Sequence, residues 1–230
     1  MRARFAVHAA GEVLVSLGVV ALLFVVYQVF WTNIEANAAA HSITDRLRDE
    51  WQTPADPTVA PTGSGSPTVS TPPGIIPAGA FALLRIPRLG ADWQEPVLEP
   101  QGKTISLDDL AQGVVHYRQT SLPGQLGNFA VAGHRQTHGQ PFRHLEQVRP
   151  GDQVIVETRT ATYTYVIDND PNSAAATVLP TDVWVLDPVP GKPGAKPVQA
   201  VITLTTCTPW WTSTYRMIAF GHLTGTVPKP

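Results

Sequence analysis

Residues 200–223 read AVITLTTCTPWWTSTYRMIAFGHL, and this stretch carries the clearest indication of the fold. Two runs rich in β-branched and apolar residues flank a short polar and aromatic segment that contains Pro209. Such runs, bounded by proline and turn residues, are typical of β-strands. Because the connection is short, the two strands are predicted to lie side by side and antiparallel.

Five more segments of the same kind precede this stretch. They are FALLRIPRL (81–89), PVLE (96–99), NFAVAGH (128–134), DQVIVET (152–158) and ATYTYVID (161–168). Polar turn clusters separate them, and no long amphipathic helix competes with them. The sequence therefore predicts an all-β barrel or sandwich of about seven or eight strands, with short helices near 107–112 and 141–147.

The N-terminus carries an apolar run, VLVSLGVVALLFVVYQVFW, over residues 13–31. Its length of about 19 uncharged residues is enough for a helix to cross a bilayer. Arg2 and Arg4 precede it and Glu35 is the first charge after it, so the positive-inside bias predicts a single-pass protein of the cell membrane with a cytoplasmic tail (1–12) and an extracellular remainder. A cleaved signal peptide is the alternative, but the run exceeds the usual length of such a segment.

Residues 32–74 are predicted to form a stalk outside the membrane. The first part, 34–51, has helical character with mixed charges, whereas 52–74 is dense in Pro, Thr, Ser and Gly. The latter composition cannot bury a core and predicts an extended spacer. Residues 75–230 are then the folded, catalytic or binding domain.

The composition excludes one class of partner and offers no cofactor site. The chain has 16 Lys and Arg against 18 Asp and Glu, a net charge of −2, scattered without a basic patch. Binding to nucleic acid needs such a patch to replace phosphate counterions, so a nucleic-acid partner is not expected. The histidines and carboxylates lack the paired spacing of zinc sites, and neither a metal nor an organic cofactor is expected.

Cys207 is the only cysteine of the chain. In an exported domain a cysteine ordinarily forms a disulfide, but no intrachain partner exists. An inert buried thiol, an intermolecular disulfide and a nucleophile remain as alternatives. Strand alternation places Cys207 on one face with Thr203 and Thr205, and Pro209 ends the strand just beyond it. Such a strand terminus beside a loop is where a scaffold can hold a thiol that substrate can reach.

Two further residue types could complete a reactive site. Arg216 begins the next strand, so its guanidinium is expected near Cys207, where it could lower the thiol pKa and stabilise an oxyanion. The spacing agrees equally well with the alternative that Arg216 is an exposed arginine paired with a carboxylate. Among the domain's histidines, His134 at the end of an apolar run is the best-placed partner and His116 is the next, whereas His138 and His144 look like loop or short-helix residues.

Three segments together resemble the sortase family. They are GNFAVAGHR (127–135), GQPFRHLEQVRPGDQVIVET (139–158) and ITLTTCTPWWTSTYRMIAFGHL (202–223). The AGHR segment, the TLTTC strand and an arginine nine residues after the cysteine occur in the order that the family shows. With the segments before them, they extend the resemblance over essentially the whole outer domain.

Within that family the chain is most similar to the class E enzymes of actinobacteria. The similar features are the pair His116 and Tyr117, the PGQLGN run at 123–128 and the proline-rich stalk behind an N-terminal anchor. The resemblance implies a closed eight-stranded β-barrel in which His134, Cys207 and Arg216 converge on a substrate groove. It assigns Tyr117 and Thr206 to that groove, together with His116 as either a groove-wall or a structural residue.

The resemblance also implies a reaction, cysteine transpeptidation. Cys207 would be the nucleophile on the Thr–Gly bond of an LPXTG-like or LAXTG-like sorting signal, Arg216 would stabilise the oxyanion and His134 would be the general acid and base. An amine of a peptidoglycan precursor, lipid II-like, would then take the acyl group, which anchors a surface protein to the cell wall.

Two rival functions are open to the same sequence. An L,D-type transpeptidase places an arginine two residues after its cysteine, where this chain has Pro209. The other rival is a non-catalytic, membrane-tethered binding or assembly module, which would need no reactive thiol.

Overall fold

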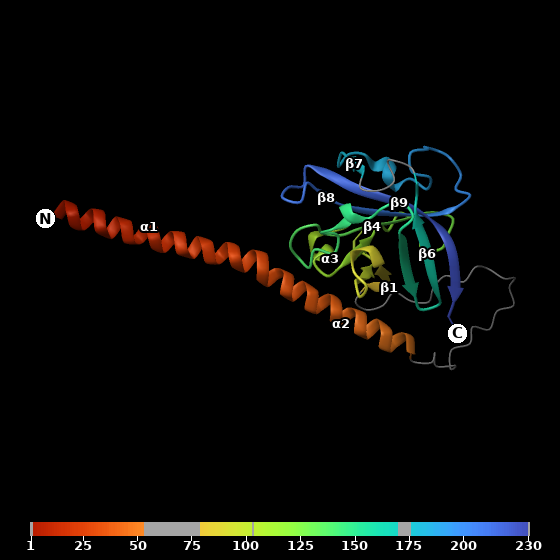
Figure 1. The fold of residues 1–230 in the computed structure, drawn as a ribbon, viewed down its shortest axis with the longest axis horizontal. Helices are drawn as coiled ribbons and strands as arrows, with labels where there is room; N and C mark the ends of the chain where they lie inside the picture. The colour runs from red at the N-terminus through yellow and green to blue at the C-terminus, as the bar shows by residue number, and fades with distance from the viewer. Residues whose placement is uncertain (1, 53–78, 103, 170–175, 230) are drawn as a thin grey trace.

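The computed structural model describes residues 2–52, 79–102, 104–169 and 176–229 (Figure 1). Eight of the described strands form one closed barrel, in the order β6-β5-β1-β2-β3-β4-β8-β9, and pairing of β6 with β9 closes it. These strands are β1 (Ala80–Arg85), β2 (Gln94–Leu98), β3 (Val114–His116), β4 (Gly127–Ala132), β5 (Gln153–Thr158), β6 (Ala161–Ile167), β8 (Ala200–Thr208) and β9 (Tyr215–Pro228). The eight-stranded barrel is thus confirmed, and each of the seven predicted strand segments overlaps one of its strands.

Short elements decorate the barrel. A three-residue strand, β7 (Ala176–Val178), which the sequence did not predict, adds to the free side of β9. The remaining elements of the domain are the helix α3 (Leu107–Leu110) and the 3-10 turns η2 (Pro87–Leu89), η3 (Leu145–Gln147) and η4 (Val183–Leu186). Both predicted short helices therefore exist, the second as a 3-10 turn.

The barrel interior is the main core of the molecule. Alternate residues of the three strands β4, β8 and β9 point into it, namely Phe129, Val131, Ile202, Leu204, Met217 and Ala219. Since side chains alternate along a strand, Thr203, Thr205 and Cys207 lie on the outward face of β8. The residues of interest for chemistry are therefore outside the barrel wall.

The segment around η4 covers part of this outward face. The side-chain amide of Asn128 on β4 donates to the carbonyl of Val185 at 2.9 Å, and the hydroxyl of Thr203 donates to the Asn128 oxygen at 2.7 Å. Trp184 packs on Phe220 of β9, with ring centroids 6.1 Å apart. The η4 segment thus covers the outward face around Thr203. The C-terminal end of β8, which carries Cys207, is not covered by these contacts.

The N-terminal part is a nearly continuous helix that begins outside the barrel and ends on it (Figure 1). It consists of α1 (Arg2–Val26), a π-helical turn η1 (Tyr27–Trp31) and α2 (Thr32–Gln52). In the described part of the chain, we find no helix with the length and apolarity that a membrane span requires. The predicted transmembrane helix at 13–31 is therefore not supported, and that apolar run lies on α1 and η1.

Helix α2 packs against the barrel. Its side chains Ile43, Leu47 and Trp51 contact a patch on β1 and β2 that includes Leu83 and Leu98. The first half of the predicted stalk is thus docked on the domain. The predicted Pro-rich linker at 52–74 lies, beyond Gln52, outside the described residues.

Candidate active site

Cys207 lies one residue before the end of β8, as a free thiol that is partly exposed. Its outward-facing neighbours Thr205 and Thr203 are buried, so at this end of β8 the strand face opens to solvent at Cys207. The hydroxyl of Thr205 donates to the carbonyl of Val131 at 3.1 Å and fastens β8 to β4. The position at an accessible strand end agrees with the alternation that the sequence predicted.

Arg216 is the direct cross-strand partner of Cys207 on β9. Cross-strand partners place their side chains on the same face, so the guanidinium shares the outward face with the thiol. Its Nη1 donates to the carbonyls of Ser213 at 2.9 Å and Tyr215 at 3.0 Å. These bonds use one of the three guanidinium nitrogens, and five N–H donors are present in all.

His134 follows β4, which runs parallel to β8 on its other side. Ala132 pairs with Thr205, and the amide of Gly133 donates to the Thr205 carbonyl at 3.1 Å. His134 and Cys207 each lie two residues beyond this pair, so they are level with each other along the direction of the two strands. The three residues predicted as reactive thus lie at the ends of three adjacent strands, at the same end of the sheet.

The environment of His134 favours the neutral imidazole. Burial lowers the pKa of His134, and the nearby charge of His138 lowers it further. The two rings stack with centroids 5.2 Å apart and an angle of 26°. The buried Nε2 of His134 has no hydrogen-bond partner within the described chain, so it can exchange a proton with a group that arrives with the substrate.

Arg135 is a site residue that the sequence analysis missed. Its buried guanidinium donates from Nη1 to the hydroxyl of Thr208 at 2.7 Å and pairs through Nη2 with Glu146 at 2.9 Å. The residue that follows His134 is thereby hydrogen-bonded to the residue that follows Cys207. Only the adjacency of Arg135 to His134 could have indicated this role.

The three predicted groove residues fall in different places. The hydroxyl of Tyr117 lies 3.2 Å from that of Thr205, so Tyr117 borders the same outward face as Cys207. Thr206 is buried on the opposite face of β8 and donates to the carbonyl of Gly133 at 2.8 Å. It supports the segment that leads to His134 and has no place in an open groove.

His116 is also away from Cys207. Only 1% of its surface is exposed, and its ring packs against Phe129 inside the barrel at 5.2 Å. Its Nδ1 lies 2.7 Å from a Glu99 oxygen, and its Nε2 lies 3.2 Å from the carbonyl of Ser121. Of its two predicted roles, the geometry matches the structural one.

Exposed aromatic residues occupy the loop between β8 and β9 and the first position of β9. Trp210, Trp211 and Tyr215 all present large apolar surfaces next to Cys207. The two tryptophan rings meet edge to face at 5.6 Å. Their exposure in an otherwise polar loop indicates a surface that binds something, since such patches mark interaction sites. The WW pair in the sequence was the available indication.

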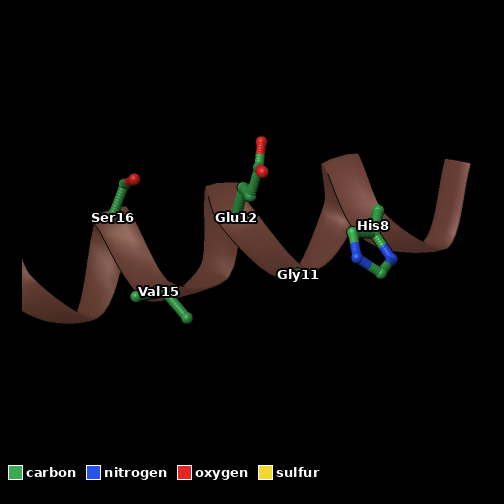
Figure 2. A pocket seen from close by; sticks show the side chains of 5 residues that line it. All are labelled: His8, Gly11, Glu12, Val15 and Ser16. Carbon is green, nitrogen blue, oxygen red and sulfur yellow. The ribbon is translucent and has the colours of Figure 1, made fainter. Parts of the chain in front are cut away.

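Two other features of the described residues do not contribute a site. No group of three or more His, Cys, Asp or Glu side chains is arranged there to hold a metal ion. Figure 2 shows a shallow hollow lined by five neighbouring residues of α1, His8, Gly11, Glu12, Val15 and Ser16. All five belong to α1, which projects from the barrel, so the hollow lies away from the barrel (Figure 1).

The barrel carries a cysteine, a histidine and an arginine at the ends of three adjacent strands, and the sortase domain model matches residues 84–224. The chain belongs to the sortase family, and its relatives place it with the class E sortases. It is 39% identical to sortase SrtE1 of Streptomyces coelicolor over 96% of this chain. The chain spans 58% of the length of that relative.

Solved structures show the same fold. Sortase E from Streptomyces avermitilis is 44% identical, with a TM-score of 0.56 over 66% of this chain and 95% of that one. Sortase E1 from Streptomyces coelicolor, solved with a tripeptide in the active site, is 40% identical, with a TM-score of 0.55 over 68% of this chain and 98% of that one.

Proposed function

We propose that this sortase cleaves the Thr–Gly bond of an LPXTG-like or LAXTG-like sorting signal and transfers the acyl group to an amine of the cell wall. The observation that carries the proposal is the pairing of Cys207 with Arg216 on one side and its level alignment with His134 on the other. A thiol, a proton carrier and a fixed cation on one surface are the groups that acyl transfer requires.

In the first half of the reaction, the Cys207 sulfur attacks the threonine carbonyl and its proton passes to His134. Negative charge develops on the carbonyl oxygen, and Arg216 donates hydrogen bonds to it. The C–N bond then breaks, the proton moves from His134 to the departing glycine amine, and a thioester remains on Cys207. The neutral form that burial favours in His134 is the form that can accept the thiol proton.

In the second half, an incoming amine attacks the thioester carbonyl. His134 takes the proton of that amine, and the C–S bond breaks. Cys207 leaves as a thiolate and takes this proton from His134. The acceptor is proposed to be the amine of a peptidoglycan precursor, lipid II-like, so that the product is a surface protein anchored to peptidoglycan. Water in place of the amine would give hydrolysis.

The surface beside Cys207 suits an extended peptide. Tyr117 borders the outward face, and Trp210 and Trp211 add exposed apolar area on the other side of the thiol. The apolar residues of a sorting signal would pack on such rings. The peptide-bound state of the Streptomyces coelicolor sortase E1 structure supports a peptide in the equivalent place here.

We further propose that the barrel works outside the cytoplasm, held at a membrane by its N-terminal arm. The support is that apolar side chains of α1 and η1 such as Leu14, Leu22 and Phe30 are more than half exposed, which water disfavours. Protease treatment of intact cells should then degrade the barrel, and washing with high salt should leave it in the membrane fraction. Release of the full chain by salt, or its protection from protease, would contradict this placement.

The transpeptidase proposal is tested with the full chain, LPXTG and LAXTG peptides, and candidate amines. Mass spectrometry should detect a thioester on Cys207 and an amine-dependent ligation product. The variant Cys207→Ala should fold and lack both products, whereas Cys207→Ser is a size-matched control with a poorer nucleophile. Peptide cleavage by folded Cys207→Ala would overturn the proposal, and absence of peptide protection against alkylation of Cys207 would favour the non-catalytic module.

A further inference from the structure

The loop after His134 contains four consecutive residues with left-handed backbone conformation. They are Thr137 (φ 63°), His138 (φ 49°), Gly139 (φ 79°) and Gln140 (φ 53°). Only glycine adopts this region readily, and a β-branched residue such as Thr137 is strongly disfavoured there. The amide of Gln140 donates to the carbonyl of Thr137 at 3.1 Å. Contacts from elsewhere must stabilise so unfavourable a turn, and strain of this kind concentrates at functional sites.

Helix α2 supplies such contacts. The amide of Gly139 donates to Oδ1 of Asn33 at 3.1 Å. The approach is close, because a Cβ on Gly139 would lie 2.9 Å from Oδ1 of Asn37 and 3.6 Å from Cβ of Ala36. Glycine is therefore required here both by its φ and by the helix that presses on it.

The turn holds His138 against His134. The rings stack at 5.2 Å, and Nδ1 of His138 lies 2.9 Å from the hydroxyl of Thr137, which fixes the ring orientation. Other charged or titratable groups around the site are Cys207 on β8, Arg216 on β9 and Arg135 next in the chain. Glu95, Arg143 and His144 line a hollow together with Gly139 of the turn and with Asn33 and Asn37 of α2. His138 differs from these groups because its ring stacks on His134 and its charge lowers the pKa of His134.

We propose that His138 is a positioning residue that fixes the imidazole of His134 for proton transfer, and that α2 sets it in place through the Asn33–Gly139 contact. This inference rests on the proposed function, in which His134 carries the proton. On this view the first half of the predicted stalk is part of the active site, because it holds the turn from which His138 reaches His134.

The direct test is the titration of His134 in the full chain, followed by NMR of the imidazole ring. In His138→Ala the ring of His134 loses its cover and the neighbouring charge, so its pKa should rise, by about half a unit or more. His138→Phe keeps a stacked ring without the charge and should give a smaller rise. The control is His144→Ala, an exposed histidine of the same loop that pairs with Glu146.

Kinetics supply an independent readout. His138→Ala should lower kcat about tenfold with little change in KM, and the acid limb of the kcat/KM profile should move to higher pH. His138→Phe should recover part of kcat. A His134 titration and a kcat that are the same in His138→Ala as in the unaltered chain would overturn the inference. Because the NMR titration needs no substrate, this failure is distinct from failure of the transpeptidase proposal.

The role of α2 is tested with Asn33→Ala, which removes the acceptor for the Gly139 amide. The pKa of His134 should rise and kcat should fall, as in His138→Ala but less. Ser42→Ala is the matched control, since this exposed polar residue of α2 donates to the carbonyl of Ala39 in its own helix. If Asn33→Ala and Ser42→Ala behave alike, α2 has no part in positioning His138.

Discussion

Arg135, the residue after His134, donates from Nη1 to the hydroxyl of Thr208, the residue after Cys207, at 2.7 Å. The same guanidinium pairs with Glu146 at 2.9 Å, beyond the loop that carries His138. One buried side chain thus joins the ends of β4 and β8 on which the proposed nucleophile and proton carrier stand. This side chain therefore ties the two strand ends to each other.

Replacing Arg135 with alanine should therefore affect both stability and activity. The change removes a charge-assisted hydrogen bond and leaves the Glu146 carboxylate and the Thr208 hydroxyl without this partner, which costs about 2–4 kcal/mol. We expect kcat for peptide cleavage to fall as His134 and Cys207 lose their fixed separation. Urea unfolding and steady-state kinetics measure the two effects.

The control for Arg135 is Arg88→Ala. Arg88 also pairs with a carboxylate, that of Asp152 at 2.7 Å, but about half of its side chain is exposed. Exposed pairs contribute little, so this variant should lose much less stability and keep its activity. Equal losses in the two variants would contradict a special role for Arg135.

Arg216→Lys should reduce turnover while leaving the fold intact. A lysine ammonium keeps the positive charge but cannot reproduce the planar fork of donors aimed at one oxygen. Loss of an oxyanion donor lowers kcat about 10²–10³-fold in other acyl-transfer enzymes, and we expect a loss of this order with the sorting-signal peptide. Arg159→Lys, at an exposed position in the β5–β6 turn, should have normal kinetics. Near-normal turnover of Arg216→Lys would remove Arg216 from the oxyanion role.

The sequence predicted the parts of the site that depend on local pattern. Strand alternation and a short connection are enough to place Cys207 opposite Arg216. The position of His134 depends on parallel pairing of β4 with β8, strands that are distant in the chain, and no local pattern specifies such a partner. Here the family resemblance chose among the histidines.

The docking of α2 was missed for a different reason. Its mixed charges suggested a solvated stalk, yet Ile43, Leu47 and Trp51 recur every four residues and form the stripe that packs on the barrel. The role of His138 could not be foreseen, because it depends on a turn whose conformation most of its residues disfavour. In the structure α2 contacts this turn at Gly139, far from it in the chain.

The buried pair of His116 and Glu99 should contribute stability with a defined pH dependence. Burial alone would raise the pKa of Glu99, but hydrogen bonds and charges from His116 and Arg118 outweigh it, so the pKa is lowered. A carboxyl with a lowered pKa stabilises the fold above its unfolded pKa of about 4.3, and the stabilisation is lost as pH falls through the folded value.

The measurement is urea unfolding of the unaltered chain and Glu99→Gln between pH 3 and 7. The difference in unfolding free energy between the two should shrink as pH falls below about 4.3. His116→Gln should lose stability but keep its KM for the peptide, since the ring faces the barrel interior. A rise in the KM for the peptide in His116→Gln would instead indicate that His116 contributes to the substrate groove.

Glu95 should show the opposite pH dependence. Burial raises its pKa to about 7. In the unfolded chain the Glu95 carboxyl ionises near pH 4.3. Between about pH 4.3 and 7 the folded chain still holds a proton that the unfolded chain has lost, so the free energy of unfolding falls as pH rises through this range. Glu95→Gln should therefore be more stable than the unaltered chain at pH 8, by about 1–3 kcal/mol, and similar to it at pH 4. An equal difference at both pH values would rule out the raised pKa.

The docking of α2 can be tested at Leu47, which is 1% exposed between the helix and the barrel. Leu47→Ala removes most of a side chain packed against Leu83 and Leu98, and a change of this kind costs about 2–4 kcal/mol in a well-packed site. The loss should be concentrated in α2, so amide exchange should accelerate in Thr32–Gln52 before it does in β1. Leu107→Ala is the control, because this leucine is 75% exposed and its truncation should change stability by less than about 0.5 kcal/mol.

If α2 already exchanges freely in the unaltered chain, it is not docked, and its contact with Gly139 cannot hold the turn of His138. If exchange accelerates only in Leu47→Ala and the pKa of His134 rises with it, helix packing and proton transfer are coupled through that turn.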